Sequence, residues 1–244
     1  MAAVSYLNTK PLLYGFEGHA IQEKINLSLE IPSVIAGKLI DGTIDIGLVP
    51  VAAIPRIPNA NIISGYGIGA RGKVASVCIF SQEPIGNITR LYLDFHSRTS
   101  VRLAQVLLKE YWKKDVELLQ AEEGYIDQIK GNTAGVIIGD RALQQLQHFP
   151  YIYDLSEHWT LHTGLPFIFA AWVANKPVPE SFKQLFDEAN AIGVKQVEAV
   201  SKLYEVPYYD LHHYYTDNIH FALTPEYVAG LELFLEKIKQ LGLV

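Results

Sequence analysis

The sequence has a single cysteine and no long run of positive charge, and both absences limit what the protein can do. With Cys78 alone, an intrachain disulfide and a zinc site made of four cysteines are both excluded. Lys and Arg number 20 against 26 Asp and Glu, which gives a formal net charge of −6, and no basic run exceeds Lys113-Lys114. Because binding to a phosphate backbone requires basic patches, we expect no nucleic-acid partner.

Signals for membranes and for export are also missing. No segment offers the roughly 18 uninterrupted apolar residues that a spanning helix needs. The N-terminus lacks a basic stretch followed by an apolar core and a small-residue cleavage site. We therefore expect no membrane partner and a cytoplasmic location. A mature chain that has already lost its signal would have the same appearance.

Strand-like and helix-like segments alternate along the chain, which predicts an α/β fold. Hydrophobic residues make up 49% of the 244 residues, enough to bury a sizeable core. Strands are predicted at 2–7, 25–31, 45–51, in two parts within 62–80, and at 91–94, 116–119, 134–138 and 165–173. Helices are predicted at 10–14, 34–40, 101–112, 125–130, 141–146, 179–203 and 224–241.

The order of these segments predicts two lobes. Residues from about 90 to 172 form a βαβα set of their own, so the flanking parts must complete the other lobe. We assign 1–88 and 174–244 to a discontinuous lobe 1 and 89–173 to lobe 2. Two crossing connections act as a hinge that lets lobes close over a ligand, which predicts an interlobe cleft.

Four blocks of the sequence carry a family resemblance. They are residues 4–12 (VSYLNTKPL), 45–51 (DIGLVPV), 72–77 (GKVASV) and 163–167 (TGLPF). In their order and spacing they resemble the chorismate dehydratases of menaquinone biosynthesis, through nearly the whole chain. The resemblance implies the two-lobed fold of type II periplasmic binding proteins, the same architecture that the segment order predicts.

The resemblance also implies an activity, namely loss of water from chorismate to give 3-[(1-carboxyvinyl)oxy]benzoate on the futalosine route. The sister enzyme 1,4-dihydroxy-6-naphthoate synthase is an alternative, but the Pro-Asn-Asp-type opening expected there is absent. A non-catalytic solute-binding protein for small carboxylates is a second alternative, and a sensor domain is a third. The expected partner is chorismate itself, and the chain is expected to be a monomer or a homodimer.

Chorismate is a dianion, and its dehydration needs orientation, charge stabilisation and a base, without a redox cofactor. No GxGxxG follows a predicted strand and no phosphate-loop lysine pattern occurs, so we expect no cofactor. His212-His213 and His220 superficially resemble a metal cluster. Their spacing is not a helical i, i+4 pair and no carboxylates complete the set, so no metal site is predicted.

Two residues are the predicted catalytic groups. Asn8 follows a strand and precedes a helix, where its amide can both donate to and accept from a substrate. The alternative is an asparagine that only stabilises a turn. Ser76 corresponds to the serine-bearing strand of the family, whereas without the resemblance it would be an ordinary structural serine.

Substrate contacts are predicted at helix starts and in the family blocks. Thr99 and Ser100 begin a long helix, where free N–H groups and the helix dipole attract carboxylates, although they are also ordinary helix caps. Trp159 is placed on the cleft wall near the hinge, or else in the interlobe core. The remaining predicted contacts are Ser5, Thr9, Asp140, Thr163 and Pro166.

The sequence leaves the identity of the catalytic base open. The opening block carries no Asp, Glu or His. Groups of the second lobe are candidates, and the substrate's own enolpyruvyl carboxylate is the alternative. The candidate groups are His96, Asp140, Glu157 and His162.

Overall fold

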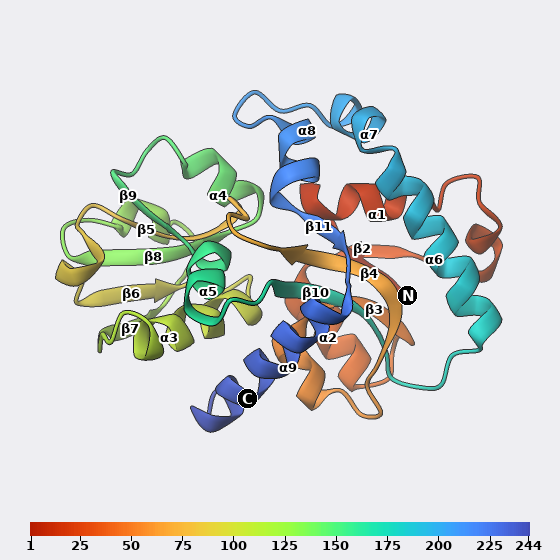
Figure 1. Cartoon of the computed structure of the whole chain (residues 1–244), viewed down its shortest axis with the longest axis horizontal. Coiled ribbons are helices and arrows are strands. Elements are labelled where there is room, and N and C mark those ends of the chain that lie inside the picture. The colour runs from red at the N-terminus through yellow and green to blue at the C-terminus, as the bar shows by residue number, and fades with distance from the viewer.

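The computed structural model describes residues 1–244 as two α/β lobes that lie side by side (Figure 1). Each lobe is built on one mixed sheet. The first sheet has six strands in the order β11-β4-β10-β3-β1-β2, and the second has five in the order β7-β6-β8-β5-β9. The predicted two-lobed α/β architecture is therefore confirmed.

The chain forms four strands of the first sheet, then all five strands of the second, and then returns to the first sheet for its last two strands. The first sheet contains β1 (Ala2–Val4), β2 (Ser28–Glu30), β3 (Ile46–Pro50), β4 (Asn61–Ala70), β10 (Phe167–Ala174) and β11 (His220–Ala222). The second contains β5 (Val77–Ser81), β6 (Arg90–Leu93), β7 (Glu117–Gln120), β8 (Thr133–Ile138) and β9 (Tyr151–Asp154). Strands β3, β5 and β8 are buried along their whole length, which explains their nearly continuous apolar sequences.

Helices cover both sheets. Those of the first lobe are α1 (Lys10–Tyr14), α2 (Pro32–Ile40), α6 (Glu180–Lys195), α7 (Val197–Leu203), α8 (Leu211–His213) and α9 (Pro225–Gln240). Those of the second are α3 (Thr99–Glu110), α4 (Asp140–Gln145) and α5 (Leu155–Thr163). Near the cleft the chain also forms two short 3-10 segments, η1 (Leu7–Thr9) and η3 (Val51–Arg56), and one π-helix, η6 (Tyr214–Asn218).

The sheet pairing does not follow the lobe boundaries expected from the sequence. β5 pairs with β8 and β9 of the second sheet, although it lies before residue 88. β10 pairs with β3 and β4 of the first sheet, although it lies almost wholly before residue 174. An apolar strand carries no local mark of the sheet it will join, so the boundary was misplaced. We propose that the chain crosses between lobes near residues 71–76 and 164–166.

Helix α5 occupies a segment in which the sequence predicted no helix. The carboxylate of Asp154 caps its start by accepting from the N–H groups of Ser156 and Glu157, at 3.0 and 3.1 Å. Gly164 ends it with a φ of +75°, the left-handed conformation that glycine adopts without strain. These two residues fix where the chain turns back toward the first sheet.

Candidate active site

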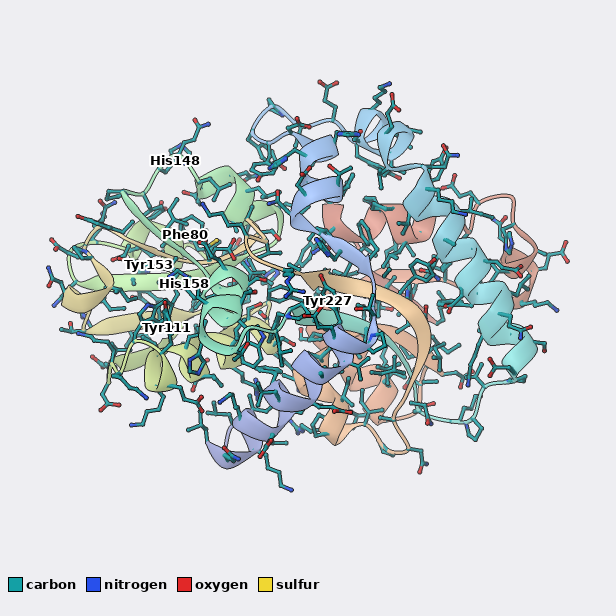
Figure 2. The ribbon with its side chains drawn as sticks, in the orientation of Figure 1. Phe80, Tyr111, His148, Tyr153, His158 and Tyr227 are labelled. Atoms are coloured by element: carbon teal, nitrogen blue, oxygen red, sulfur yellow. The ribbon has the colours of Figure 1, made fainter.

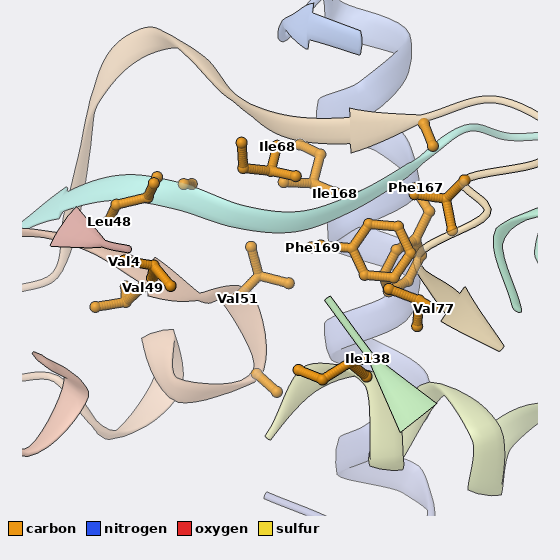
Figure 3. Packing of buried hydrophobic residues seen from close by; sticks show 14 of the residues in the cluster. Val4, Leu48, Val49, Val51, Ile68, Val77, Ile138, Phe167, Ile168 and Phe169 are labelled. Carbon is orange, nitrogen blue, oxygen red and sulfur yellow. The ribbon is translucent and has the colours of Figure 1, made fainter. Parts of the chain in front are cut away.

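A cavity lies between the two lobes and is lined by 19 residues. It encloses about 590 Å³ of empty space, including the part that is open to solvent. Figure 3 shows apolar side chains from both sheets, among them Phe169 of the first sheet and Val77 of the second, and both residues line the cavity. The apolar lining includes Val4, Leu48, Ile68, Val77, Ile138 and Phe169. A mostly apolar cleft with a few polar groups is typical of a site for a small molecule.

Five of the predicted site residues line this cavity together. Asn8 and Thr9 come from η1, which begins a few residues after β1 of the first lobe. Ser76 lies one residue before β5, and Thr99 and Ser100 form the first turn of α3. The fold therefore brings together polar groups that are up to 92 residues apart, counted from Asn8 to Ser100 (100 − 8).

The start of α3 is tied to both lobes. Thr99 Oγ1 accepts a hydrogen bond of 3.1 Å from the N–H of Ala52 in η3. Ser100 N donates to Ser97 Oγ at 2.9 Å, so Ser97 caps the first turn. The positive end of a 12-residue helix is thus held against the cavity in a fixed position.

Three predicted contacts, Trp159, Thr163 and Pro166, do not line the cavity. Trp159 is fully buried, and its Nε1–H donates to the carbonyl oxygen of Pro166 at 3.2 Å. Thr163 Oγ1 donates to the carbonyl oxygen of Trp159 at 2.8 Å. The indole packs edge-on against Phe167, with ring centroids 5.3 Å apart. The polar groups of these residues already have partners within the protein. Their contacts hold the chain where it returns into β10.

Two further predicted contacts are also absent from the lining. Ser5 is exposed to solvent. Asp140, at the start of α4, has an Oδ1 that accepts a 3.2 Å hydrogen bond from Leu7 N in the other lobe. Burial raises the pKa of the Asp140 carboxyl, while the bond from Leu7 opposes that rise. Asp140 therefore connects the lobes next to the cavity.

Tyr6 and His96 face each other across the lobes, and they are the two lining residues with ionisable side chains. The hydroxyl of Tyr6 and Nδ1 of His96 share a 2.9 Å hydrogen bond. Burial raises the pKa of Tyr6 to about 12, and burial followed by the charge of Arg141 lowers the pKa of His96. Both side chains are therefore uncharged near neutral pH. Sequence reasoning had named His96 among the bases but had missed Tyr6.

A model of the family described as menaquinone biosynthesis matches residues 1–240 of the chain. The chain belongs to this family. A chorismate dehydratase from Thermus thermophilus is 26% identical over 200 residues, and the match covers 70% of each chain.

Solved structures agree on the fold. Protein AF1704 from Archaeoglobus fulgidus superimposes with a TM-score of 0.74 at 13% identity, covering 100% of this chain and 97% of the other. The periplasmic aliphatic sulphonate binding protein SsuA from Escherichia coli gives 0.62 at 14% identity, covering 100% and 93%. At these identities the likeness shows the fold alone, and it confirms the predicted periplasmic-binding-protein architecture.

The other base candidates of this family member do not line the cavity. His162 Nε2 is 3.2 Å from the carboxylate of Glu110, which also pairs with Lys237 of α9. Glu157 lies 4.0 Å from Lys73 Nζ. Neither side chain belongs to the lining, and neither does Asp140, so His96 is the one candidate that does.

A buried ion pair supports the loop that carries His96. Asp94 is 1% exposed and accepts two hydrogen bonds of 2.8 and 2.7 Å from Arg141. Its Oδ1 also accepts from the backbone N–H of His96 at 2.9 Å, and Oδ2 accepts from the hydroxyl of Tyr125 at 3.0 Å. Asp94 thus holds the end of β6 and the start of α4 in one arrangement.

No group of three or more His, Cys, Asp or Glu side chains is placed to hold a metal ion. No helix has the length and apolar character needed to cross a bilayer.

Proposed function

We propose that the chain is a chorismate dehydratase, a hydro-lyase that converts chorismate into 3-[(1-carboxyvinyl)oxy]benzoate. Membership of the menaquinone biosynthesis family over residues 1–240 is the observation that carries the proposal. The likeness to the Thermus thermophilus chorismate dehydratase supports the same reaction. A cavity between lobes that combines apolar walls with hydroxyl and amide groups suits a small ring acid.

The product fixes which bonds change. The ether stays on ring carbon 3, so carbon 3 loses its proton and carbon 4 loses its hydroxyl. The electron pair of the C3–H bond forms the new ring double bond as the C4–O bond breaks. The departing hydroxide takes up one proton and leaves as water, and the ring becomes aromatic. The protein must orient the ring, bind two carboxylates and exclude other reactions.

Neutral donors bind the dianion in this proposal. One carboxylate lies at the first turn of α3, where Thr99 and Ser100 add hydroxyls to the positive helix end. Asn8 and Thr9 contact the substrate from the first lobe, with the Asn8 amide opposite the reacting carbons. Ser76 contributes a further hydroxyl from the connection between the lobes.

Two sources of the base fit the lining. His96 Nε2 makes no hydrogen bond with the protein, so the neutral tautomer whose Nδ1–H donates to Tyr6 leaves Nε2 free to accept the ring proton. The enolpyruvyl carboxylate of the substrate is the other source, and the protein then only folds the substrate and shields it. An analogue without that carboxylate would bind and stay unreacted in the second case, whereas turnover of the analogue would exclude it.

Incubation with chorismate tests the function directly. We expect the substrate to disappear and an aromatic product with the absorbance of a benzoate to form, at a rate proportional to protein concentration. Mass spectrometry should find the substrate mass less one water. Tight binding of chorismate with no product would contradict the proposal and would support a solute-binding protein instead.

A further inference from the structure

Two fully buried hydroxyls from distant parts of the chain meet at the edge of the cavity. Ser76 and Tyr214 are both 0% exposed. The Tyr214 hydroxyl donates to Ser76 Oγ at a distance of 2.7 Å. Ser76 lines the cavity and Tyr214 does not, so the tyrosine lies behind the serine as seen from the cavity.

This contact decides which way the serine proton points. Burial raises the pKa of Tyr214 well above its ordinary value, so the phenol keeps its proton, and the contact has that proton donated to Ser76 Oγ. Each hydroxyl has one proton to donate. Ser76 Oγ accepts the proton of Tyr214 and donates to no group of the protein. A buried O–H without an acceptor is unfavourable, and because Ser76 belongs to the lining of the cavity, a ligand there can supply the acceptor.

Both residues are held rigidly by the backbone around them. The N–H of Ser76 donates to the carbonyl of Val74 at 2.7 Å, and its carbonyl accepts from Gly139 N at 2.8 Å. Tyr214 begins the π-helix η6, whose last residue, Asn218, donates from its side chain to the carbonyl of Lys73 at 3.1 Å. Isolated π-helical turns are rare and are often found at functional sites.

We propose that Tyr214 is a positioning residue that commits the Ser76 hydroxyl to donate into the cavity, to a carboxylate oxygen of the ligand. We infer a carboxylate as the acceptor because charge-assisted hydrogen bonds are stronger than neutral ones. That choice rests on the proposed function, in which the substrate has two carboxylates. The orientation of the serine proton itself depends only on the contact with Tyr214.

Calorimetric binding of isophthalate, a stable ring dicarboxylate, tests the inference with a double-mutant cycle. Ser76→Ala should weaken binding about tenfold, because a charged acceptor loses its donor. Tyr214→Phe should weaken it about threefold to tenfold, because the serine proton is no longer directed. In the Ser76→Ala background, Tyr214→Phe should change affinity by less than about twofold, since the tyrosine acts only through the serine.

Tyr227→Phe is the matched control. Tyr227, labelled in Figure 2, is also buried. Its hydroxyl has no partner, and it is not among the residues that line the cavity. Its variant should bind isophthalate as the wild type does, and thermal unfolding of each variant checks the fold.

Three results would overturn the inference. They are an equal effect of Tyr214→Phe with and without Ser76, an unchanged affinity of Ser76→Ala, and no binding of isophthalate by the wild type. Turnover is measured separately. If the cycle shows the coupling but chorismate is not converted, the proposed function fails and the positioning role stands. If chorismate is converted but no coupling appears, only the positioning role fails.

Discussion

Among the side chains that line the cavity, His96 is the one whose ordinary pKa lies close to neutral pH. Burial is the largest cause that lowers this pKa below 6.5, and the positive charge of Arg141 lowers it further, whereas the carboxylate of Asp94 raises it. Tyr6, whose hydroxyl bonds to the imidazole, stays neutral because its own pKa is raised to about 12. The ligand-free cavity therefore presents no charged side chain near neutral pH.

We expect nuclear magnetic resonance to show the His96 imidazole titrating below 6.5 in the ligand-free protein. A bound dicarboxylate should raise this pKa, because the dianion stabilises imidazolium. By linkage, dicarboxylate affinity should increase as the pH falls through the His96 pKa. His96→Gln should remove the signal and the pH dependence, whereas His148→Gln, at an exposed position, should leave both unchanged. Titration of His96 above 6.5 would contradict this account.

Removal of the Asn8 side-chain amide tests catalysis at the scale of a single residue. Asn8→Ala should lower kcat by about a hundredfold, similar to the loss of one oriented donor in other enzymes, and should leave the fold intact because Asn8 is only partly buried. Asn87→Ala removes an exposed amide that is not part of the cavity lining and should leave kcat unchanged. Steady-state rates with chorismate give the comparison. Equal rates for the two variants would remove Asn8 from the mechanism.

At the scale of secondary-structure elements, two glycines let α1 approach α6 closely. A Cβ atom on Gly193 would lie 2.0 Å from the carbonyl oxygen of Pro11, and one on Gly15 would lie 1.8 Å from that of Ala189. Contacts this short require the helices to separate. Since α1 follows η1 directly, the separation would also displace Asn8.

Gly193→Ala should therefore destabilise the fold by about 2 kcal/mol or more, as overpacking does, and should lower turnover as well. Gly37→Ala is the opposite case, because nothing lies within 4 Å of a Cβ built in that part of α2. It should stabilise the protein by about 0.5–1 kcal/mol through helix propensity. Denaturant unfolding measures both changes. A Gly193→Ala protein as stable as the wild type would show that the two helices can separate freely.

Local sequence predicted most elements but not their partners. The apolar runs at 45–51 and 134–138 correspond to β3 and β8, since burial of a strand is encoded in its own residues. The sheet to which β5 belongs could not be predicted in this way, because pairing joins residues far apart. Likewise Trp159 was expected on the cleft wall, although its indole N–H is already bonded within the core.

The candidate site likewise contains residues that local sequence predicted and one residue, Tyr214, that it did not. Asn8, Ser76 and Thr99 were predicted from family blocks and helix starts, and all three line the cavity. Tyr214 was interpreted as packing between helices, as one of several tyrosines in a row. Its contact with Ser76 spans 138 residues, and no local pattern distinguishes it from its neighbours.

At the scale of the whole molecule, a few hydrogen bonds join the lobes around the cavity. Tyr6 bonds to His96 at 2.9 Å, Leu7 N donates to Asp140 at 3.2 Å, and Ala52 N donates to Thr99 at 3.1 Å. Each net hydrogen bond contributes about 1 kcal/mol. These bonds act together with the Glu110–Lys237 pair and with an apolar core that includes residues of both sheets. A ligand that contacts both lobes should favour the closed arrangement further.

X-ray scattering in solution tests this balance. Isophthalate should reduce the radius of gyration of the wild type, because it binds the closed lobes in preference. Asp140→Ala removes the acceptor of Leu7 N, so its ligand-free form should be more expanded and its affinity about tenfold lower. Asp127→Ala changes an exposed carboxylate outside the lining and should match the wild type in both measurements. A radius that is the same for all three proteins, with and without ligand, would mean that the lobes form one rigid body and that ligand enters without a hinge motion.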